Sequence, residues 1–166
     1  QHEGSTWIVE SIDDTARNEF VCLSQDTASS PDQDVVFNKT AIIHGVGLLA
    51  ADFANMAADH ASLIWSPRSN IDLYGNTAQV VLAANTGVRI ALGSDWAISG
   101  SMNMVRELHC AEELNGRNFG GFFSERQLID MATKNAAGAM GMGDLIGSLA
   151  VGHYADLAIW NASAHK

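Results

Sequence analysis

The fold is decided by the stretch VRIALGSD, residues 88–95. Its apolar residues predict a buried strand over residues 88–92, and Gly93 and Ser94 then allow the chain to turn. Asp95 follows directly, so a carboxylate stands at the carboxyl end of the strand. In a barrel of parallel strands and helices, the loops at these ends converge on one mouth, where catalytic groups collect. Asp95 is therefore the first candidate for a functional residue.

Two earlier stretches repeat this arrangement. Residues 40–43, TAII, predict a strand that ends in His44, and residues 62–65, SLIW, predict a strand that leads into SPRSN at 66–70. Consecutive strand ends lie about one strand–helix unit apart. An imidazole, the amide of Asn70 and a carboxylate therefore stand at three successive strand ends. This pattern predicts the rim of an active site, with the three side chains on one face, rather than a hydrophobic core.

Helical signals alternate with these strands, and such alternation predicts a parallel sheet. Asp13 can cap a helix, and two capping boxes, Asn76 with Gln79 and Ser124 with Gln127, predict the starts of two more. The other expected elements are helices over about 48–59 and 102–114, a loop at 66–70 and an edge-type strand at 155–160.

The composition is that of a globular protein, and it excludes some partners. The 166 residues suffice for one ordinary domain, with 47% hydrophobic and 17% charged residues. A net charge of −10 argues against nucleic acid and anionic membrane surfaces as partners, because both need clustered Lys and Arg. No apolar run reaches ~20 residues, so no transmembrane helix is expected.

The cysteines and the opening residues bear on where the protein resides. Cys22 and Cys110 are too few for a disulfide framework and lack metal-site spacing, so we expect reduced thiols in the core of a cytoplasmic protein. The first residues lack the basic and apolar regions of a signal peptide. The absence of an initiator Met predicts a fragment or a processed chain.

Four motifs follow one another along the chain. They are His44-Gly45 after an apolar strand, Pro67-x-Ser69-Asn70-x-x-Leu73, the stretch 87–95, and the glycine-rich tail over 147–158. In this order and spacing they resemble the later strands of the metal-dependent amidohydrolase superfamily, above all its cytosine-deaminase, chlorohydrolase and imidazolonepropionase types. The resemblance implies an α/β fold: residues 1–143 would form strands five to eight, the second half of a (β/α)8 barrel of TIM type. Residues 144–166 would begin a small C-terminal β-sandwich.

The resemblance also implies a role for each strand-end residue. Asp95 matches the eighth-strand aspartate, a metal ligand that also takes a proton from the metal-bound water. His44 matches the sixth-strand histidine, beside the metal or the attacked group, and is a candidate both for catalysis and for the metal. Ser69 and Asn70 match the seventh-strand loop that shapes the substrate pocket, although they can equally brace their own turn. Trp96 is a candidate aromatic wall of that pocket, or a cover over the mouth.

The fifth strand fits the family pattern poorly. Family members carry a metal-binding His there and often a Glu three residues later. Glu3 followed by Gly4 resembles that Glu, which would place the His upstream of Gln1; alternatively, His2 is itself the ligand. The family's first ligands, a His-x-His pair, occur nowhere in the sequence. The chain therefore lacks the usual ligand set of a catalytic zinc site.

The resemblance implies part of a metal-dependent hydrolase acting on C–N bonds of a small molecule, by deaminating a heterocycle or opening a cyclic amide. One divalent ion, expected to be Zn²⁺, would lower the pKa of its bound water towards ~7 and so activate it. This chain alone is expected to be inactive. An alternative is a catalytically incomplete half-barrel that binds a small molecule or a partner chain.

The open sheet edges of such a half-barrel bear on its partners. Because unpaired strand edges recruit other chains, we expect pairing with a second copy, as a homo-oligomer, or with the missing amino-terminal half. A doubly wound nucleotide-binding domain is disfavoured, since no Gly-x-Gly-x-x-Gly follows a strand.

Overall fold

The computed structural model describes residues 5–24 and 34–159, in which strands alternate with helices. The strands are β1 (Ser5–Val9), β2 (Thr40–His44), β3 (Ser62–Trp65) and β4 (Arg89–Leu92). The helices are α1 (Asp14–Leu23), α2 (Ala50–Ala58), α3 (Pro67–Tyr74), α4 (Val80–Thr86), α5 (Met104–Asn118), α6 (Glu125–Ala132) and α7 (Lys134–Ala139).

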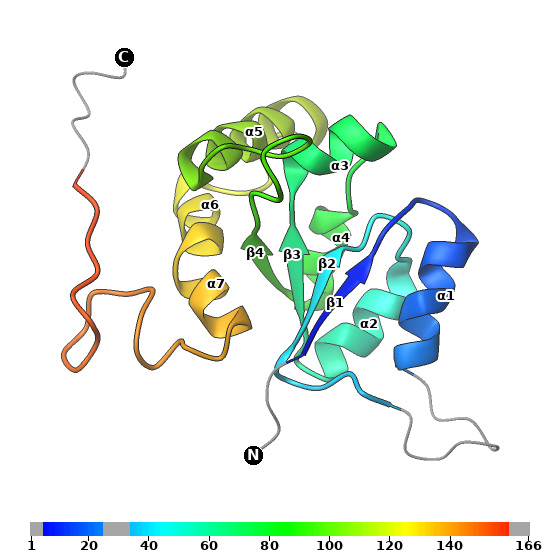
Figure 1. Cartoon of the computed structure of the whole chain (residues 1–166), viewed down its shortest axis with the longest axis horizontal. Coiled ribbons are helices and arrows are strands. Elements are labelled where there is room, and N and C mark those ends of the chain that lie inside the picture. Colours follow the sequence, from blue (N-terminus) through cyan, green and yellow to red (C-terminus); the bar gives the residue numbers. More distant parts are fainter. Residues whose placement is uncertain (1–4, 25–33, 160–166) are drawn as a thin grey trace.

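The four described strands form one parallel sheet in the order β1-β2-β3-β4. Val9 lies opposite His44, and Trp65 lies opposite Leu92, so the carboxyl ends of the strands share one edge of the sheet. Helices α3 and α5 lie beyond that edge (Figure 1). The α/β class and the parallel sheet are thus confirmed. A doubly wound sheet reverses its strand order at a switch point, and the described strands run in one direction without such a reversal.

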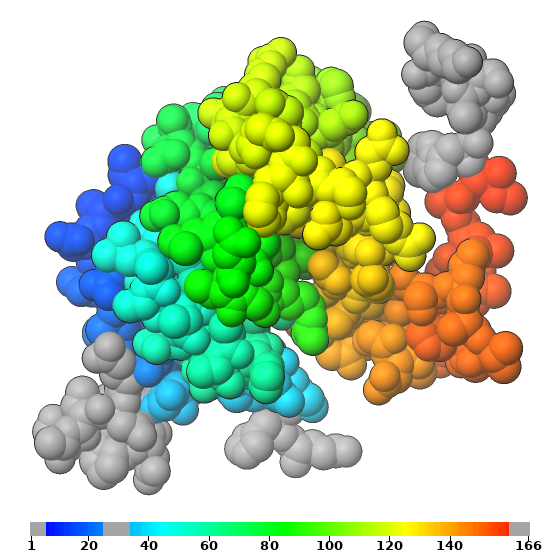
Figure 2. Space-filling view, turned by 180° about the vertical axis from the view of Figure 1, so that it is seen from behind, coloured from blue at the N-terminus to red at the C-terminus, as the bar shows by residue number. Residues whose placement is uncertain are grey.

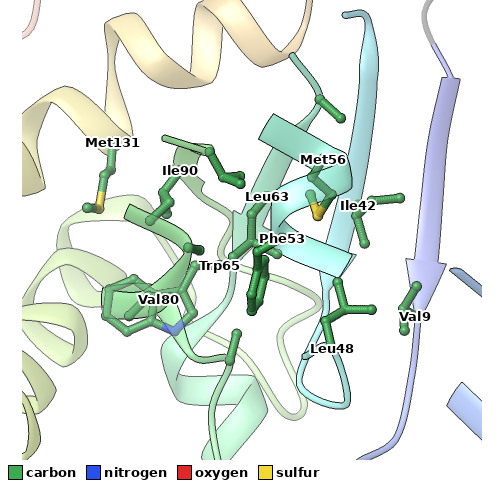
Figure 3. Packing of buried hydrophobic residues seen from close by; sticks show 14 of the residues in the cluster. Val9, Ile42, Leu48, Phe53, Met56, Leu63, Trp65, Val80, Ile90 and Met131 are labelled. Carbon is green, nitrogen blue, oxygen red and sulfur yellow. The ribbon is translucent and has the colours of Figure 1, made fainter. Parts of the chain in front are cut away.

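Apolar side chains at alternating strand positions pack beneath the helices (Figure 3). The buried strand residues include Val9, Ile42, Leu63 and Ile90, and the side chains around them include Leu48, Phe53, Met56, Val80 and Met131. Successive side chains of a strand point to opposite faces. Ile8, Ile43 and Ile64, on the other face, are partly exposed. The described helices therefore cover one face of the sheet and leave an apolar second face partly open.

Strand β1 has no counterpart among the strands expected from hydrophobic runs. Both Trp7 and Ile8 on it are exposed, so it lacks the continuous buried pattern of a central parallel strand. Its carboxyl end is followed directly by Glu10, at the sheet edge where His44 also lies.

The segment expected to be a loop after β3 is helical, so that expectation is wrong. Helix α3 begins with Pro67 at its first position and ends at Tyr74, where the capping residue Gly75 has a left-handed φ of 64°. Proline is favoured at the first position of a helix, where its missing N–H would have no intrahelical partner. Ser69 and Asn70 consequently lie on the first turn of a helix, and both are fully buried.

Two of the three predicted helix caps are confirmed. The Asp13 carboxylate accepts a hydrogen bond from the backbone N–H of Ala16, and Ser124 forms a capping box with Gln127. The third prediction, Asn76 with Gln79, is wrong. Helix α4 begins one residue after Gln79, whose side-chain amide instead donates to the carbonyl of Leu48. A contact between distant segments has replaced the local cap.

The segment after α7 extends from the side of the molecule formed by α6 and α7 (orange to red in Figure 2). Residues 155–159 form no strand with any described residue, so the predicted edge strand is wrong for this part. The physical reason is that a strand is defined by pairing, and no described strand lies alongside to accept it. Trp160 lies outside the described residues.

The cysteine prediction is partly wrong. Both cysteines are free, but Cys22 is exposed and Cys110 is only half-buried, so neither is a core thiol. Within the described ranges, every helix is too short or too polar to cross a membrane.

Candidate functional site

The chain turns through a left-handed backbone conformation at His44 and Asp95, and Ser11 after β1 also has a positive φ, of 107°. The φ angle is 66° at His44 and 56° at Asp95. Non-glycine residues rarely adopt this conformation, although His and Asp tolerate it better than most. Such strained residues cluster at functional sites, where the surrounding structure holds them. The two side chains singled out from the sequence are therefore also the two placed by unusual turns at the ends of β2 and β4.

The side chains of His44, Asn70 and Asp95 lie together. The Asn70 side-chain nitrogen Nδ2 lies 3.0 Å from His44 Nδ1, and His44 Nε2 lies 3.8 Å from Asp95 Oδ2. His44 is 3% exposed and Asn70 is fully buried, whereas the Asp95 side chain is 23% exposed. The prediction that these three strand-end groups share one face is confirmed; their chemical roles stay predictions.

Serines hold the carboxylate of Asp95. Ser69 Oγ donates a hydrogen bond to Asp95 Oδ2, and Ser69 Oγ also lies 3.2 Å from Ser99 Oγ. The other carboxylate oxygen, Oδ1, accepts from the backbone N–H of Trp96 at 2.8 Å. Both oxygens of Asp95 therefore have donors on this chain, which fixes the orientation of the carboxylate.

A tight loop brings Asp95 and Ser99 back towards each other. Ser101 N donates to Ser94 O at 2.8 Å, and Gly100 N donates to Trp96 O at 2.8 Å. A Cβ at Gly100 would collide with the Ser94 carbonyl oxygen. The close approach of the backbone at Ser94 and at Gly100 thus requires glycine at position 100.

Trp96 lies on this loop with 60% of its surface exposed. It contacts Asp95 through its backbone, and its indole ring is open to solvent. An exposed ring beside the carboxylate is compatible with a pocket wall and equally with a cover over the mouth.

The electrostatic environment of His44 favours its neutral form. Burial lowers the pKa of His44, and the negative charges of Asp95 and Glu10 oppose this effect without reversing it. The Tyr74 ring lies edge-on to the imidazole, with centroids 5.9 Å apart. Burial, with Glu10 and Asp95 next in effect, raises the pKa of the Tyr74 phenol. Glu10 and Tyr74 thus belong to the surroundings of His44, although neither is among the residues predicted from sequence.

Glu107 is a buried carboxyl group behind the site. A charged residue on a helix is usually solvated, but Glu107 on α5 is fully buried. Its Oε1 accepts from the backbone N–H of Arg68 at 3.1 Å, and the Ser101 hydroxyl lies close enough to act on the same carboxyl group. Burial raises the pKa of Glu107. Its spacing of four and eight residues from Ala111 and Asn115, the other buried residues of α5, is the sequence signal that could have revealed it.

The residues expected to supply the fifth-strand ligand are not the ones at the end of the first described strand. His2 and Glu3 lie outside the described residues, and β1 begins after them, at Ser5. The residue that follows β1 is Glu10. Trp7 stands three residues before Glu10, so Glu10 does not have the family's spacing of a His followed three residues later by a Glu.

The described residues do not complete a metal site. Residues 5–24 and 34–159 contain no group of three His, Cys, Asp or Glu side chains placed to hold an ion. A catalytic zinc site needs three protein ligands and an open position. Asp95 and His44 are the donors at the mouth, and two donors are too few.

Comparisons with known proteins identify relatives of this chain. A model described as the amidohydrolase family matches residues 16–166. A 5-methylthioadenosine/S-adenosylhomocysteine deaminase of Teredinibacter turnerae is 36% identical over 122 residues, which cover 71% of this chain and 27% of that protein. The enzyme of the same name from Desulforudis audaxviator is 33% identical over 123 residues, covering 72% and 29%. The chain therefore spans less than a third of the length of these curated relatives.

Solved structures share the fold. An adenosine deaminase from Xanthomonas campestris with bound zinc superposes with a TM-score of 0.70 at 24% identity, covering 83% of this chain and 34% of that one. An atrazine chlorohydrolase from Arthrobacter aurescens, complexed with zinc and atraton, gives a TM-score of 0.69 at 14% identity, covering 90% and 34%. At these identities the likeness concerns the fold.

Proposed function

This chain belongs to the amidohydrolase family, and we propose on that basis that it is part of a longer metal-dependent hydrolase acting on a C–N bond of a small molecule. The observation that carries the proposal is the cluster of His44, Asn70 and Asp95 at neighbouring strand ends, joined by contacts of 3.0 and 3.8 Å. A buried imidazole and an oriented, partly exposed carboxylate are the groups that hydrolysis of such a bond requires.

We propose that residues 1–143 are the second half of a (β/α)8 barrel and that 144–166 begin a small β-sandwich. The unreversed order of the parallel strands supports the first part, since consecutive strands of a barrel are neighbours. The partly open apolar face carrying Ile8, Ile43 and Ile64 also supports it, because the closed barrel would bury that face.

Asp95 is proposed as one ligand of a divalent ion, expected to be Zn²⁺, and as the group that accepts a proton from the attacking water. A bound zinc ion lowers the pKa of a coordinated water from 15.7 to about 7. Asp95 would deliver the proton to the leaving amine, and Ser69 and the N–H of Trp96 would keep the carboxylate in place. Apart from His44, the other candidate donor at the mouth, further ligands would have to come from residues outside the described part of this chain.

Deamination of a heterocycle is the preferred reaction within this class. The two curated relatives described above are named as deaminases of 5-methylthioadenosine and S-adenosylhomocysteine. The chain covers less than a third of each relative, so the substrate is a proposal and not a shown property. We propose 5-methylthioadenosine as the first substrate to test, because both names include it. Ser69, Asn70 and Trp96 are proposed to shape the pocket for the heterocycle.

The complete coding region provides the decisive test. We expect it to contain a His-x-His pair upstream of Gln1, and its product to retain zinc after dialysis and to release ammonia from 5-methylthioadenosine. Asp95→Asn should lower kcat at least ~100-fold, the usual effect of losing a general acid or base. Asp72→Asn, an exposed aspartate on the outer side of α3, is the matched control.

The second candidate is a catalytically incomplete half-barrel that binds a small molecule or a partner chain, favoured by the shortage of ligands among the described residues. A complete coding region without His-x-His, whose product holds no zinc and releases no ammonia, would establish it. In either case the 166-residue chain by itself should be inactive and should pair with a second copy or with the missing half. Light scattering that shows a stable monomer of 17.7 kDa would contradict the pairing.

A further inference from the structure

A row of hydrogen bonds connects the hydrophobic core with His44. The indole nitrogen Nε1 of Trp65, at the end of β3, lies 2.7 Å from Thr77 Oγ1 in the loop between α3 and α4. Thr77 Oγ1 lies 3.4 Å from Asn70 Oδ1 on α3, and Asn70 Nδ2 lies 3.0 Å from His44 Nδ1. Four segments that are separate in sequence therefore meet in one row.

The chemistry of Trp65 sets the direction of this row. An indole N–H can only donate, so Thr77 Oγ1 must accept that bond. The single hydroxyl hydrogen of Thr77 is then free to donate to Asn70 Oδ1. With the carbonyl of Asn70 facing Thr77, the NH₂ group of Asn70 faces the imidazole. This orientation gives the Thr77 hydroxyl hydrogen an acceptor. In the reverse orientation Thr77 Oγ1 would accept from both Trp65 and Asn70, and its own hydrogen would lose this partner.

The orientation of Asn70 determines where His44 carries its proton. A neutral imidazole has one N–H and one acceptor nitrogen. Because Asn70 donates to Nδ1, this nitrogen is the acceptor and the proton is on Nε2. The Nε2–H group faces Asp95 Oδ2 at 3.8 Å, at the mouth of the strand ends.

We infer that Trp65 and Thr77 are positioning residues, which act through Asn70 to hold His44 in the tautomer with its proton on Nε2. In this tautomer His44 presents a hydrogen-bond donor to the mouth, and its Nε2 has no lone pair for a metal ion. His44 would then serve the reaction as a donor, and the ligand set would contain Asp95 without it. The tautomer is independent of the proposed function, whereas its use in catalysis rests on that function.

The surroundings leave His44 little freedom to escape this arrangement. Trp65 and Asn70 are fully buried, and His44 is 3% exposed. The Tyr74 ring stands edge-on to the imidazole at an interplanar angle of 76°. If the imidazole ring flipped, Asn70 Nδ2 would face a carbon and remain as an unpaired donor in the core, which is costly.

The test is ¹⁵N NMR of the full chain labelled at histidine, at pH ~7.5, above the ordinary histidine pKa of about 6.5. Comparison with His44→Asn assigns the His44 signals among the six histidines. We expect a protonated Nε2 and an unprotonated Nδ1 in the wild type and in Thr77→Ser, which keeps the hydroxyl. Thr77→Val should shift the population towards the Nδ1-protonated form, because Asn70 is then free to turn its carbonyl to the imidazole. Trp65→Phe removes the same constraint from the other end and should act in the same direction.

A wild-type His44 protonated on Nδ1 would overturn the inference. So would a folded Thr77→Val variant with an unchanged tautomer, which would show that Thr77 does not position Asn70. The spectrum requires neither metal nor substrate. An NMR result that contradicts the tautomer therefore does not contradict the proposed hydrolase. Likewise, a complete protein without hydrolase activity does not contradict the tautomer.

Discussion

Ser69, on the first turn of α3, donates a hydrogen bond to Oδ2 of Asp95, which lies beyond the end of β4. The same oxygen is the one that faces Nε2 of His44, beyond β2. One carboxylate oxygen thus connects groups delivered by three strand–helix units, and the geometry of the site depends on how firmly that oxygen is held.

Ser69→Ala should destabilise the chain through this bond. A hydrogen bond to a charged group contributes about 1.5–3 kcal/mol, and we expect the free energy of unfolding, measured with urea, to fall by that order. Ser148→Ala is the control, because Ser148 forms an exposed hydrogen bond with His153 in the tail; its effect should stay within ~0.5 kcal/mol. An equally small effect at Ser69 would mean that the serine does not restrain Asp95.

His44 should make the chain less stable as the pH falls. Burial lowers the pKa of His44 in the folded state, so below the ordinary value of about 6.5 the unfolded chain binds a proton that the folded chain does not. The free energy of unfolding should therefore decrease on acidification from that pH, by at most about 1.4 kcal/mol per pH unit for one group. His44→Asn removes the titration and still tolerates a positive φ. A wild-type chain that gains stability relative to His44→Asn between pH ~6.5 and 5 would contradict the prediction.

Glu107→Gln should stabilise the chain at neutral pH and lose this advantage in acid. Burial raises the pKa of Glu107 in the folded state, so its effect on wild-type stability is most favourable below the unfolded pKa of about 4.3 and is lost as the pH rises through the folded pKa. Glutamine can still accept from Arg68 N and carries no charge. Urea unfolding of both chains between pH ~4 and 8 measures the difference. A variant less stable than wild type at every pH would mean that the fold requires the carboxylate.

Gly100→Ala should cost about 1–3 kcal/mol of stability, as overpacking does, because the added methyl group meets the Ser94 carbonyl. In the complete protein it should also lower activity, since the loop carries Asp95. Gly116→Ala is the matched control: a Cβ there meets nothing within 4 Å, and the residue lies inside α5. Alanine at an open helix position should add about 0.5–1 kcal/mol. The urea midpoint should fall for Gly100→Ala and rise for Gly116→Ala. Equal shifts in the two variants would contradict the prediction.

The proximity of His44, Asn70 and Asp95 could be predicted from sequence because parallel strands bring their carboxyl ends to one edge. That inference needs only the strand positions, and it survived the wrong assignment of residues 66–70 as a loop. Strand β1 was not predicted from hydrophobic runs, because its exposed Trp7 and Ile8 do not form a buried run.

Contacts between distant segments could not be predicted from the sequence. Gln79 reads locally as part of a capping box, and only the approach of Leu48 gives it another partner. Thr77 has no local signal of a role, because its partners Trp65 and Asn70 reach it only through the packing of α3 against the end of the sheet. Glu107 carried a signal in its helical spacing, but a charged residue on a helix is usually solvated.

The unreversed order of the strands has a consequence for how the protein is made. During synthesis the amino-terminal part of a chain leaves the ribosome first. Each of β2, β3 and β4 emerges when the strand it must pair with is already present, because that partner is always the strand just before it. The sheet can therefore grow one unit at a time in step with translation. Among these four strands, each newly added strand becomes the template for the next, and closure of the proposed barrel is the one pairing that would have to wait for the last strand.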